Sequence, residues 1–290
     1  MLSRHVFDAT MRLSGFTTGD NITPRQYSQS LRHETGARKL GYNRNDHAPR
    51  TVLTEEPILG ENVTMPHAVL ISDFDGTMTA NDFYKLAAER LLPPDALTPW
   101  EDYRAGSITH FEALRRIFGR LRASPEALQA ILSDMRPDPD LAASLARLRT
   151  SGWEVVVASA GCDWYIRRIL AEAGVTVEVH ANPGVHVLPE GSLRMDFPED
   201  SPFQCLETGV DKAGIVRFHR DGGALVAFAG DGLADLPAAL ETPAAMRFAR
   251  ADLALALSQA GEFFRPFNRW AEVADALVMN PAKAATEGPV

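Results

Sequence analysis

Apolar and polar positions form two kinds of pattern along the chain. Residues 28–50 are polar and show almost no apolar periodicity, which is typical of a disordered or loosely attached segment. From Met65 onward, short apolar runs alternate with stretches whose apolar residues recur at helical spacing. We therefore expect an N-terminal extension over residues 1–64 and a folded remainder.

The short apolar runs predict buried strands. The first covers residues 67–73 (HAVLISD), and four more lie at 153–159, 175–180, 224–229 and 246–249. Helical patterns accompany them at 141–150, 163–173, 212–219, 234–240 and 268–276. Strands that alternate with helices indicate a parallel sheet covered on both faces. One pair of runs, 185–188 and 192–197, alternates and turns like a β-hairpin instead.

The first and second predicted strands are separated by helical patterns alone, at 81–92, 109–121 and 125–135. We expect these to form a helical insert, or cap, over residues 79–136. The core then comprises residues 65–78 and 137–280, with residues 281–290 as a tail. The predicted fold class is α/β, with a helical unit inserted after the first strand.

Composition and charge narrow the class of protein. The chain has 290 residues, of which 45% are hydrophobic and 23% charged, as in ordinary soluble enzymes. The net charge of -9 argues against nucleic acid or an anionic membrane surface as the partner. No apolar run approaches the roughly 18 residues needed to span a bilayer. The two cysteines, Cys162 and Cys205, are expected to be reduced thiols of a cytoplasmic protein.

Two acidic residues come directly after the first predicted strand. Asp73 and Asp75 are two apart, so in extended backbone both carboxylates can face one site. Neighbouring carboxylates repel each other, and Mg²⁺, which prefers hard oxygen ligands, relieves that repulsion. Gly76 permits a sharp turn close to a ligand. The motif alone also fits a surface turn with capping aspartates, but a surface turn needs no buried strand before it.

Two later strand ends carry polar groups as well, and ligands bind at the carboxyl ends of parallel strands. Ser159 and Ala160 offer a hydroxyl and backbone N–H groups before a helix, which suits a phosphate, although Ser159 also fits a plain N-cap. Asp231 and Asp235 are four apart and approach one face if a helix begins between them. Lys212 would supply the counter-charge that these carboxylates and a phosphate require.

This ordered set resembles the four signature motifs of the haloacid dehalogenase (HAD) superfamily: Asp73-Phe74-Asp75-Gly76-Thr77, Ser159, Lys212 and Gly230-Asp231-Gly232-x-x-Asp235. The helical insert resembles the C1 cap of its phosphoserine phosphatase-like branch. Asn81-Asp82, residues 107–121 and the stretch from Ser159 to Asp163 are similar to the methylthiopentenyl phosphate phosphatases of methionine salvage. A cysteine-rich stretch precedes the lysine in that group, whereas here only Cys205 is found.

The resemblance implies a Rossmann-like HAD core and a Mg²⁺-dependent phosphatase that acts on a small phosphorylated metabolite. Asp73 would be the nucleophile, which becomes an aspartyl phosphate, and Asp75 the general acid and base. The remaining implied roles are metal binding by Asp73, Asp75, Asp231 and Asp235, phosphate binding by Thr77, Ser159, Ala160 and Lys212, and substrate selection by Asn81, Asp82, Tyr103 and Arg104. His110 shows no ligand spacing and is assigned no role.

Several alternatives stay open at this point. A phosphoserine phosphatase would need cap groups for the charged ends of an amino acid. A phosphomutase retains both aspartates, whereas a dehalogenase is disfavoured because its reaction leaves no ester oxygen for Asp75 to protonate. A catalytically silent phosphate-binding regulatory module is the non-enzyme alternative. The oligomeric state is not indicated by the sequence.

Met65 stands directly before the first strand, so residues 1–64 fit a genuine tail, an organelle presequence or an extension upstream of the true start. We predict that a chain beginning at Met65 is soluble and hydrolyses phosphate esters as the full chain does. Phosphate release and thermal unfolding, measured on both chains, test this. Loss of folding in the shorter chain would mean that residues 1–64 pack on the domain.

Overall fold

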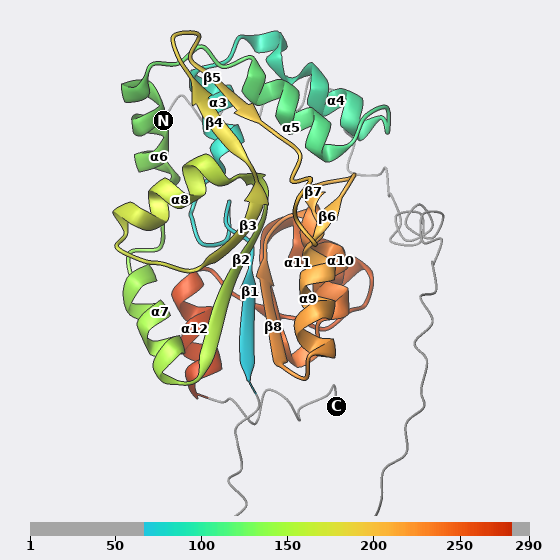
Figure 1. Cartoon of the computed structure of the whole chain (residues 1–290). Helices are drawn as coiled ribbons and strands as arrows, with labels where there is room; N and C mark the ends of the chain where they lie inside the picture. The colour runs from blue at the N-terminus through green and yellow to red at the C-terminus, as the bar shows by residue number, and fades with distance from the viewer. Residues whose placement is uncertain (1–66, 280–290) are drawn as a thin grey trace, which may run out of the picture. The chain divides into compact units, whose positions relative to one another are not determined.

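A six-stranded parallel sheet forms the centre of the molecule in this computed structural model, which describes residues 67–279 (Figure 1). The expected extension over residues 1–64 and the tail over 281–290 lie outside the described residues. The strand order is β10-β9-β8-β1-β2-β3. The strands are β1 (Ala68–Ser72), β2 (Trp153–Cys162), β3 (Glu178–Asn182), β8 (Leu225–Gly230), β9 (Arg247–Ala249) and β10 (Arg265–Pro266). The predicted α/β class with a parallel sheet is confirmed.

Strand β1 lies in the middle of the sheet, paired with β2 on one side and β8 on the other. Its Leu70 is opposite Val155 and Ala227 in the two neighbours, and all five of its residues are buried. A run of apolar residues without alternation is what a strand needs when both faces of the sheet are covered. The chain therefore leaves the centre of the sheet at Asp73.

Helices cover the two faces of the sheet in separate layers (Figure 1). Leu70, Val155 and Val157 belong to the core shared with α7 (Leu141–Thr150), α8 (Asp163–Glu172) and α12 (Trp270–Met279). Ile71, Val156 and Phe228 belong to a second core. It is completed by α9 (Lys212–Asp221), α10 (Leu236–Glu241) and α11 (Ala251–Gln259). Successive residues of a strand thus point into opposite layers, as the two-residue period of a strand requires.

The helices between β1 and α7, which we call the cap, lie beyond the end of the sheet where β1 finishes (Figure 1). Its elements are α3 (Phe83–Arg90), the short 3₁₀ turn η1 (Pro94–Leu97), α4 (Thr98–Arg104), α5 (His110–Gly119) and α6 (Pro125–Met135). Thr109 and Ser124 begin α5 and α6 by accepting hydrogen bonds from Glu112 N and Ala127 N, as N-caps do. The 98–104 helix was not predicted from the sequence.

Two hairpins from later in the chain also contact the cap. Strands β4 (Gly184–Val187) and β5 (Ser192–Met195) pair as predicted, and Phe197 beyond them meets Phe111 of α5 edge to face at 5.4 Å. Strands β6 (Gln204–Cys205) and β7 (Gly209–Val210) were not predicted, because two residues are too few for a pattern. Between them, the Glu207 carbonyl accepts a hydrogen bond from Phe111 N at 2.8 Å.

Within residues 67–279, no helix is both long enough and apolar enough to cross a membrane.

Helix α12 is joined to the central strand by one buried hydrogen bond. The Trp270 indole donates to Ser72 Oγ at 3.0 Å, and Ser72 Oγ donates to the Asp73 carbonyl at 2.8 Å. We predict that Trp270→Ala lowers the free energy of unfolding by about 3–5 kcal/mol through the cavity it leaves. Trp270→Phe removes less volume and one hydrogen bond, so its loss should be smaller, about 1–3 kcal/mol. Urea unfolding of both variants measures this, and equal stability of all three proteins would contradict it.

Candidate active site

The ends of β1 and β8 bring two aspartates together. Ser72 is paired with Ala229, so Asp73 and Asp231 come after neighbouring strands at nearly the same level. Asp235 joins them from the 3₁₀ turn η2 (Leu233–Asp235). One carboxylate oxygen from each of Asp73, Asp231 and Asp235 lies within 4.8 Å of the others, and this is the one such acidic group in residues 67–279.

A buried lysine neutralises part of this charge. Lys212 is the first residue of α9, and its Nζ lies 2.6 Å from Asp73 Oδ1 and 2.6 Å from Asp235 Oδ1. The side chain of Lys212 is only 5% exposed. Burial by itself would lower the pKa of Lys212, but the two carboxylates outweigh burial and raise the pKa above its usual range. The lysine is therefore held as a cation between two anions.

Asp235 has both oxygens engaged by the protein. While Oδ1 accepts from Lys212, Oδ2 accepts from the backbone N–H groups of Asp231 and Gly232, each at 3.0 Å. The Asp235 carboxylate thus fixes the loop after β8 and the lysine at the same time. It is the part of the acidic group that organises the other members.

The three carboxylates of the acidic group outnumber the single positive charge of Lys212, so the group has a net negative charge. Burial, and then repulsion from Asp235, raises the pKa of Asp73, while burial, and then repulsion from Asp73, raises the pKa of Asp231. Hard oxygen ligands that repel one another at this range are a suitable donor set for a divalent cation such as Mg²⁺. The residues present therefore fit a metal site. Thr77 Oγ1 connects two of them, at 3.1 Å from Asp231 Oδ1 and 3.3 Å from Asp73 Oδ2.

Gly76 is required by the same arrangement. It has a φ of 71°, and a Cβ placed there would come within 2.3 Å of Asp231 Oδ2. Any other residue would therefore be strained and would also displace the Asp231 carboxylate.

Asp75 is held apart from the acidic group by different partners. Its Oδ1 accepts from Phe83 N at 2.9 Å, at the start of cap helix α3, and its Oδ2 accepts from the Tyr165 hydroxyl at 2.7 Å. Burial, and then repulsion from Asp82, raises the pKa of Asp75 to about 7. A carboxyl group with a pKa in this range can both release and take up a proton near neutral pH.

Tyr165 was not predicted to be a site residue. Its ring stacks on Phe83 at 4.4 Å, and a Cβ at Gly161 would lie 1.9 Å from its hydroxyl. The glycine after Ser159-Ala160 is therefore what leaves room for the bond between Tyr165 and Asp75. In the sequence, that glycine was the only sign that a side chain comes close.

The last part of β2 carries the predicted phosphate-binding residues, because the strand runs to Cys162 and not only to residue 159. Ser159 Oγ accepts from Gly161 N at 3.0 Å, and Ser159 and Ala160 both border the cavity above the acidic group. The buried Asn182 donates to the Ala160 carbonyl at 2.8 Å and to the Thr208 carbonyl at 3.0 Å. Asn182, which the sequence did not single out, thus connects the end of β2 to the β6–β7 hairpin.

A cavity of about 180 Å³ lies between the cap and the strand ends. The structure brings most of the predicted residues to this cavity. Its lining includes Asp73, Asp75, Asp82, Tyr103, Ser159, Ala160, Lys212, Asp231 and Asp235. Three predicted residues are not in its lining: Thr77, Asn81 and Arg104. Thr77 is buried, Asn81 Nδ2 donates to the Asp134 carbonyl at 2.8 Å, and Arg104 is exposed.

Besides Tyr165, four rings of the cap border the same cavity: Tyr84, Trp100, Tyr103 and His110. Tyr103 was the only one of these predicted. The four rings come from three different cap helices, and one of these helices was itself not predicted. No one-dimensional pattern connects them.

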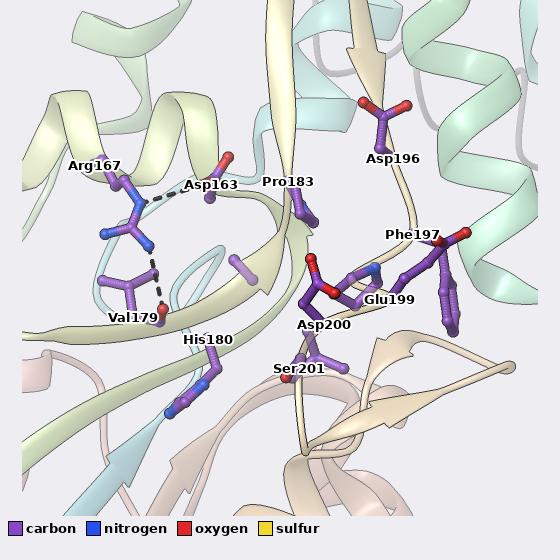
Figure 2. A pocket seen from close by; sticks show the side chains of 13 residues that line it. Asp163, Arg167, Val179, His180, Pro183, Asp196, Phe197, Glu199, Asp200 and Ser201 are labelled. Atoms are coloured by element: carbon purple, nitrogen blue, oxygen red, sulfur yellow. Dashed lines mark hydrogen bonds and ion pairs between the residues drawn. The ribbon is translucent and has the colours of Figure 1, made fainter.

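A larger hollow of about 580 Å³ lies beyond edge strand β3, and Figure 2 shows it from close by. Its acidic residues include Asp163, Asp196 and Asp200, while its Arg167 is bound to Asp163 at 3.1 Å and to the Val179 carbonyl at 3.3 Å. None of these residues belongs to the close acidic group found in residues 67–279. Size alone therefore does not identify the reactive site, whereas the chemistry of the smaller cavity does.

The sequence profile of the haloacid dehalogenase-like hydrolases matches residues 70–240, and the chain belongs to this family. A 2-hydroxy-3-keto-5-methylthiopentenyl-1-phosphate phosphatase of Bacillus velezensis is 26% identical over 208 residues, which cover 71% of this chain and 87% of the relative. The predicted assignment to the HAD-type phosphatases is confirmed by this family match together with relatives that carry phosphatase names.

Solved structures share the fold. A HAD family hydrolase from Salmonella enterica serovar Typhi matches with a TM-score of 0.57 and 18% identity, over 74% of this chain and 72% of that one. A phosphoserine phosphatase, solved as a phospho-aspartyl intermediate analogue, matches with a TM-score of 0.53 and 17% identity, over 72% of this chain and 98% of that one. At these identities the likeness concerns the fold alone.

Proposed function

We propose that the protein is a Mg²⁺-dependent phosphomonoesterase that works through a phosphorylated Asp73. The observation that carries this proposal is the buried group of Asp73, Asp231 and Asp235 around Lys212, next to an Asp75 carboxyl held by separate donors. One carboxylate is available for attack, and a second has the pKa of a proton carrier.

The metal would be held by Asp73, Asp231 and, directly or through water, Asp235, with Asp75 contributing from the loop. When bound, Mg²⁺ supplies positive charge that offsets the negative charge of the phosphoryl group. Lys212 provides a second positive charge on the protein side. Ser159, Ala160 and Thr77 would offer hydroxyl and backbone N–H donors to phosphate oxygens.

The chemistry would proceed in two displacements at phosphorus. In the first, an Asp73 oxygen forms a bond to phosphorus while the ester bond to the leaving oxygen breaks, and Asp75 donates its proton to that oxygen. In the second, water attacks the phosphoaspartate, Asp75 accepts a proton from the water, and inorganic phosphate leaves. Asp75 thereby returns to its starting protonation state, so that one ester and one water give one alcohol and one phosphate.

For the substrate, we propose a small phosphorylated metabolite, for which the methionine-salvage enediol phosphate named in the relatives is the first candidate. We further propose a cytoplasmic location and the division into a core (65–78 and 137–280) and a cap (79–136). The alternative substrate, phosphoserine, would need groups for both charged ends of an amino acid.

Asp73→Asn should reduce phosphate release by more than about 1,000-fold, because an amide is a far weaker nucleophile than a carboxylate. The measurement is Mg²⁺-dependent phosphate release from a panel of phosphate esters. Removal of divalent cations with a chelator should abolish activity, and added Mg²⁺ should restore it. The matched control is Asp221→Asn, which changes an exposed carboxylate paired with Arg220 on the outer surface.

Near wild-type turnover by Asp73→Asn would refute the phosphoaspartate route. If wild-type protein bound inorganic phosphate but released none from any ester, the non-enzyme alternative would hold instead. Circular dichroism of the variant checks that its fold is intact.

Tyr165→Phe should lower kcat by about tenfold with little change in KM, because Asp75 loses a donor that orients its carboxyl group. The test is a double-mutant cycle with Asp75→Asn. If Tyr165 acts through Asp75, then Tyr165→Phe has no further effect once Asp75 has been changed. Additive losses in the cycle would show that Tyr165 acts by another route.

A further inference from the structure

The cap side of the catalytic cavity is a wall of rings, which we call the ring wall: Tyr84, Trp100, Tyr103 and His110. Trp100 lies at its centre, stacked on Tyr84 at 4.9 Å and close to Tyr103 at 5.2 Å and His110 at 5.4 Å. Tyr103 and His110 meet edge to face at 5.3 Å. All four border the cavity whose floor is the acidic group. A phosphate on that floor would therefore have its leaving group facing the rings.

The cationic side chains of this lining are already paired. Lys212 is held by Asp73 and Asp235, and Lys85 forms an ion pair with Asp82 while lying over the Tyr84 ring at 5.8 Å. Among the described lining residues these two lysines are the cations, against six aspartates. A substrate carboxylate could pair with Lys85 only by displacing Asp82. It would also add negative charge to a cavity that already has an excess of it.

His110 borders this cavity and has a buried polar atom without a partner. Its Nδ1 is enclosed and has no hydrogen-bond partner, which is costly for a buried polar atom. Burial, and then the nearby charge of Lys212, lower the pKa of His110 to about 4. The ring is therefore neutral near neutral pH, and a neutral imidazole can donate one hydrogen bond and accept one. Such a group suits a hydroxyl or carbonyl rather than a carboxylate.

We propose that the ring wall is the leaving-group subsite, and that it selects phosphate esters of uncharged, partly apolar alcohols or enols that carry a hydroxyl or carbonyl for His110. Rings provide apolar contact without charge, and the paired lysines leave no counter-ion for an acidic leaving group. Esters whose leaving group carries a carboxylate, phosphoserine included, would be poor substrates. This inference rests on the proposed phosphatase function.

A matched pair of esters tests the charge selection. Glycerol 3-phosphate and 3-phosphoglycerate differ in that a hydroxymethyl group replaces a carboxylate. We expect kcat/KM to be at least about tenfold higher for glycerol 3-phosphate, which corresponds to roughly 1.4 kcal/mol. Each ester is also assayed as a competitor of phenyl phosphate hydrolysis, so that the ratio is measured even where turnover is slow. Equal values, or a preference for 3-phosphoglycerate, would overturn the inference.

Variants of His110 test the polar contact. Phenyl phosphate has no hydroxyl or carbonyl in its leaving group, so the ratio of kcat/KM for glycerol 3-phosphate to that for phenyl phosphate reports the contact. His110→Phe should lower this ratio about tenfold. His110→Asn, which keeps a polar atom near the Nδ1 position, should recover part of it. Phe218→Ala, which removes an exposed ring of α9 far along the helix from Lys212, is the control and should leave the ratio unchanged.

Failure of this inference and failure of the proposed phosphatase function give different results. If His110→Phe lowers kcat/KM for both esters by the same factor, the histidine has only a structural role and the inference is wrong, while the phosphatase function stands. If no ester, phenyl phosphate included, releases phosphate from the wild-type protein, the proposed function itself is wrong and the inference falls with it.

Discussion

The structure depends on one buried cation, the Lys212 ammonium, held between Asp73 and Asp235. Taking a lysine and two carboxylates out of water is costly, and only close mutual contact compensates for it. Contacts of 2.6 Å on both sides meet that condition. Because Asp73 lies after β1, Asp235 lies after β8 and Lys212 begins α9, the same contacts join three elements at one point. The Asp73 carboxylate is thus oriented by the interactions that hold this end of the sheet together.

A second constraint separates the two aspartates of the first motif. Asp73 faces a lysine and the acidic group, whereas Asp75 faces a backbone N–H and a phenol. Although they are only two residues apart, they therefore meet different partners. Two identical side chains acquire different acid–base behaviour through their neighbours, which is the general way in which one site obtains both a nucleophile and an acid. The glycines Gly76 and Gly161 provide the space for it.

Sequence patterns were sufficient to predict five of the six strands of the main sheet, all but the two-residue β10, and the polar residues at their carboxyl ends. The run HAVLIS is buried from Ala68 to Ser72. The polar residues after β1 and β8 and in the last part of β2 converge because the carboxyl ends of parallel strands share an edge. The ring wall could not be predicted, since its members come from α3, α4 and α5 and meet only when those helices pack. Tyr165 and Asn182 were not predicted for the same reason: each acts through a partner more than 20 residues away.

The bond from Phe83 N to Asp75 also couples the cap to the chemistry. Phe83 is the first residue of α3, so the cap contributes a donor to the Asp75 carboxylate directly. When α3 is seated, the carboxylate is oriented; if α3 moved away, Asp75 would lose a donor and gain access to bulk water. Closure of the cap over a substrate and readiness of the proton carrier would then be a single event. An enzyme built in this way would be protected against wasteful turnover, because its proton carrier would be fully oriented only while α3 is in place.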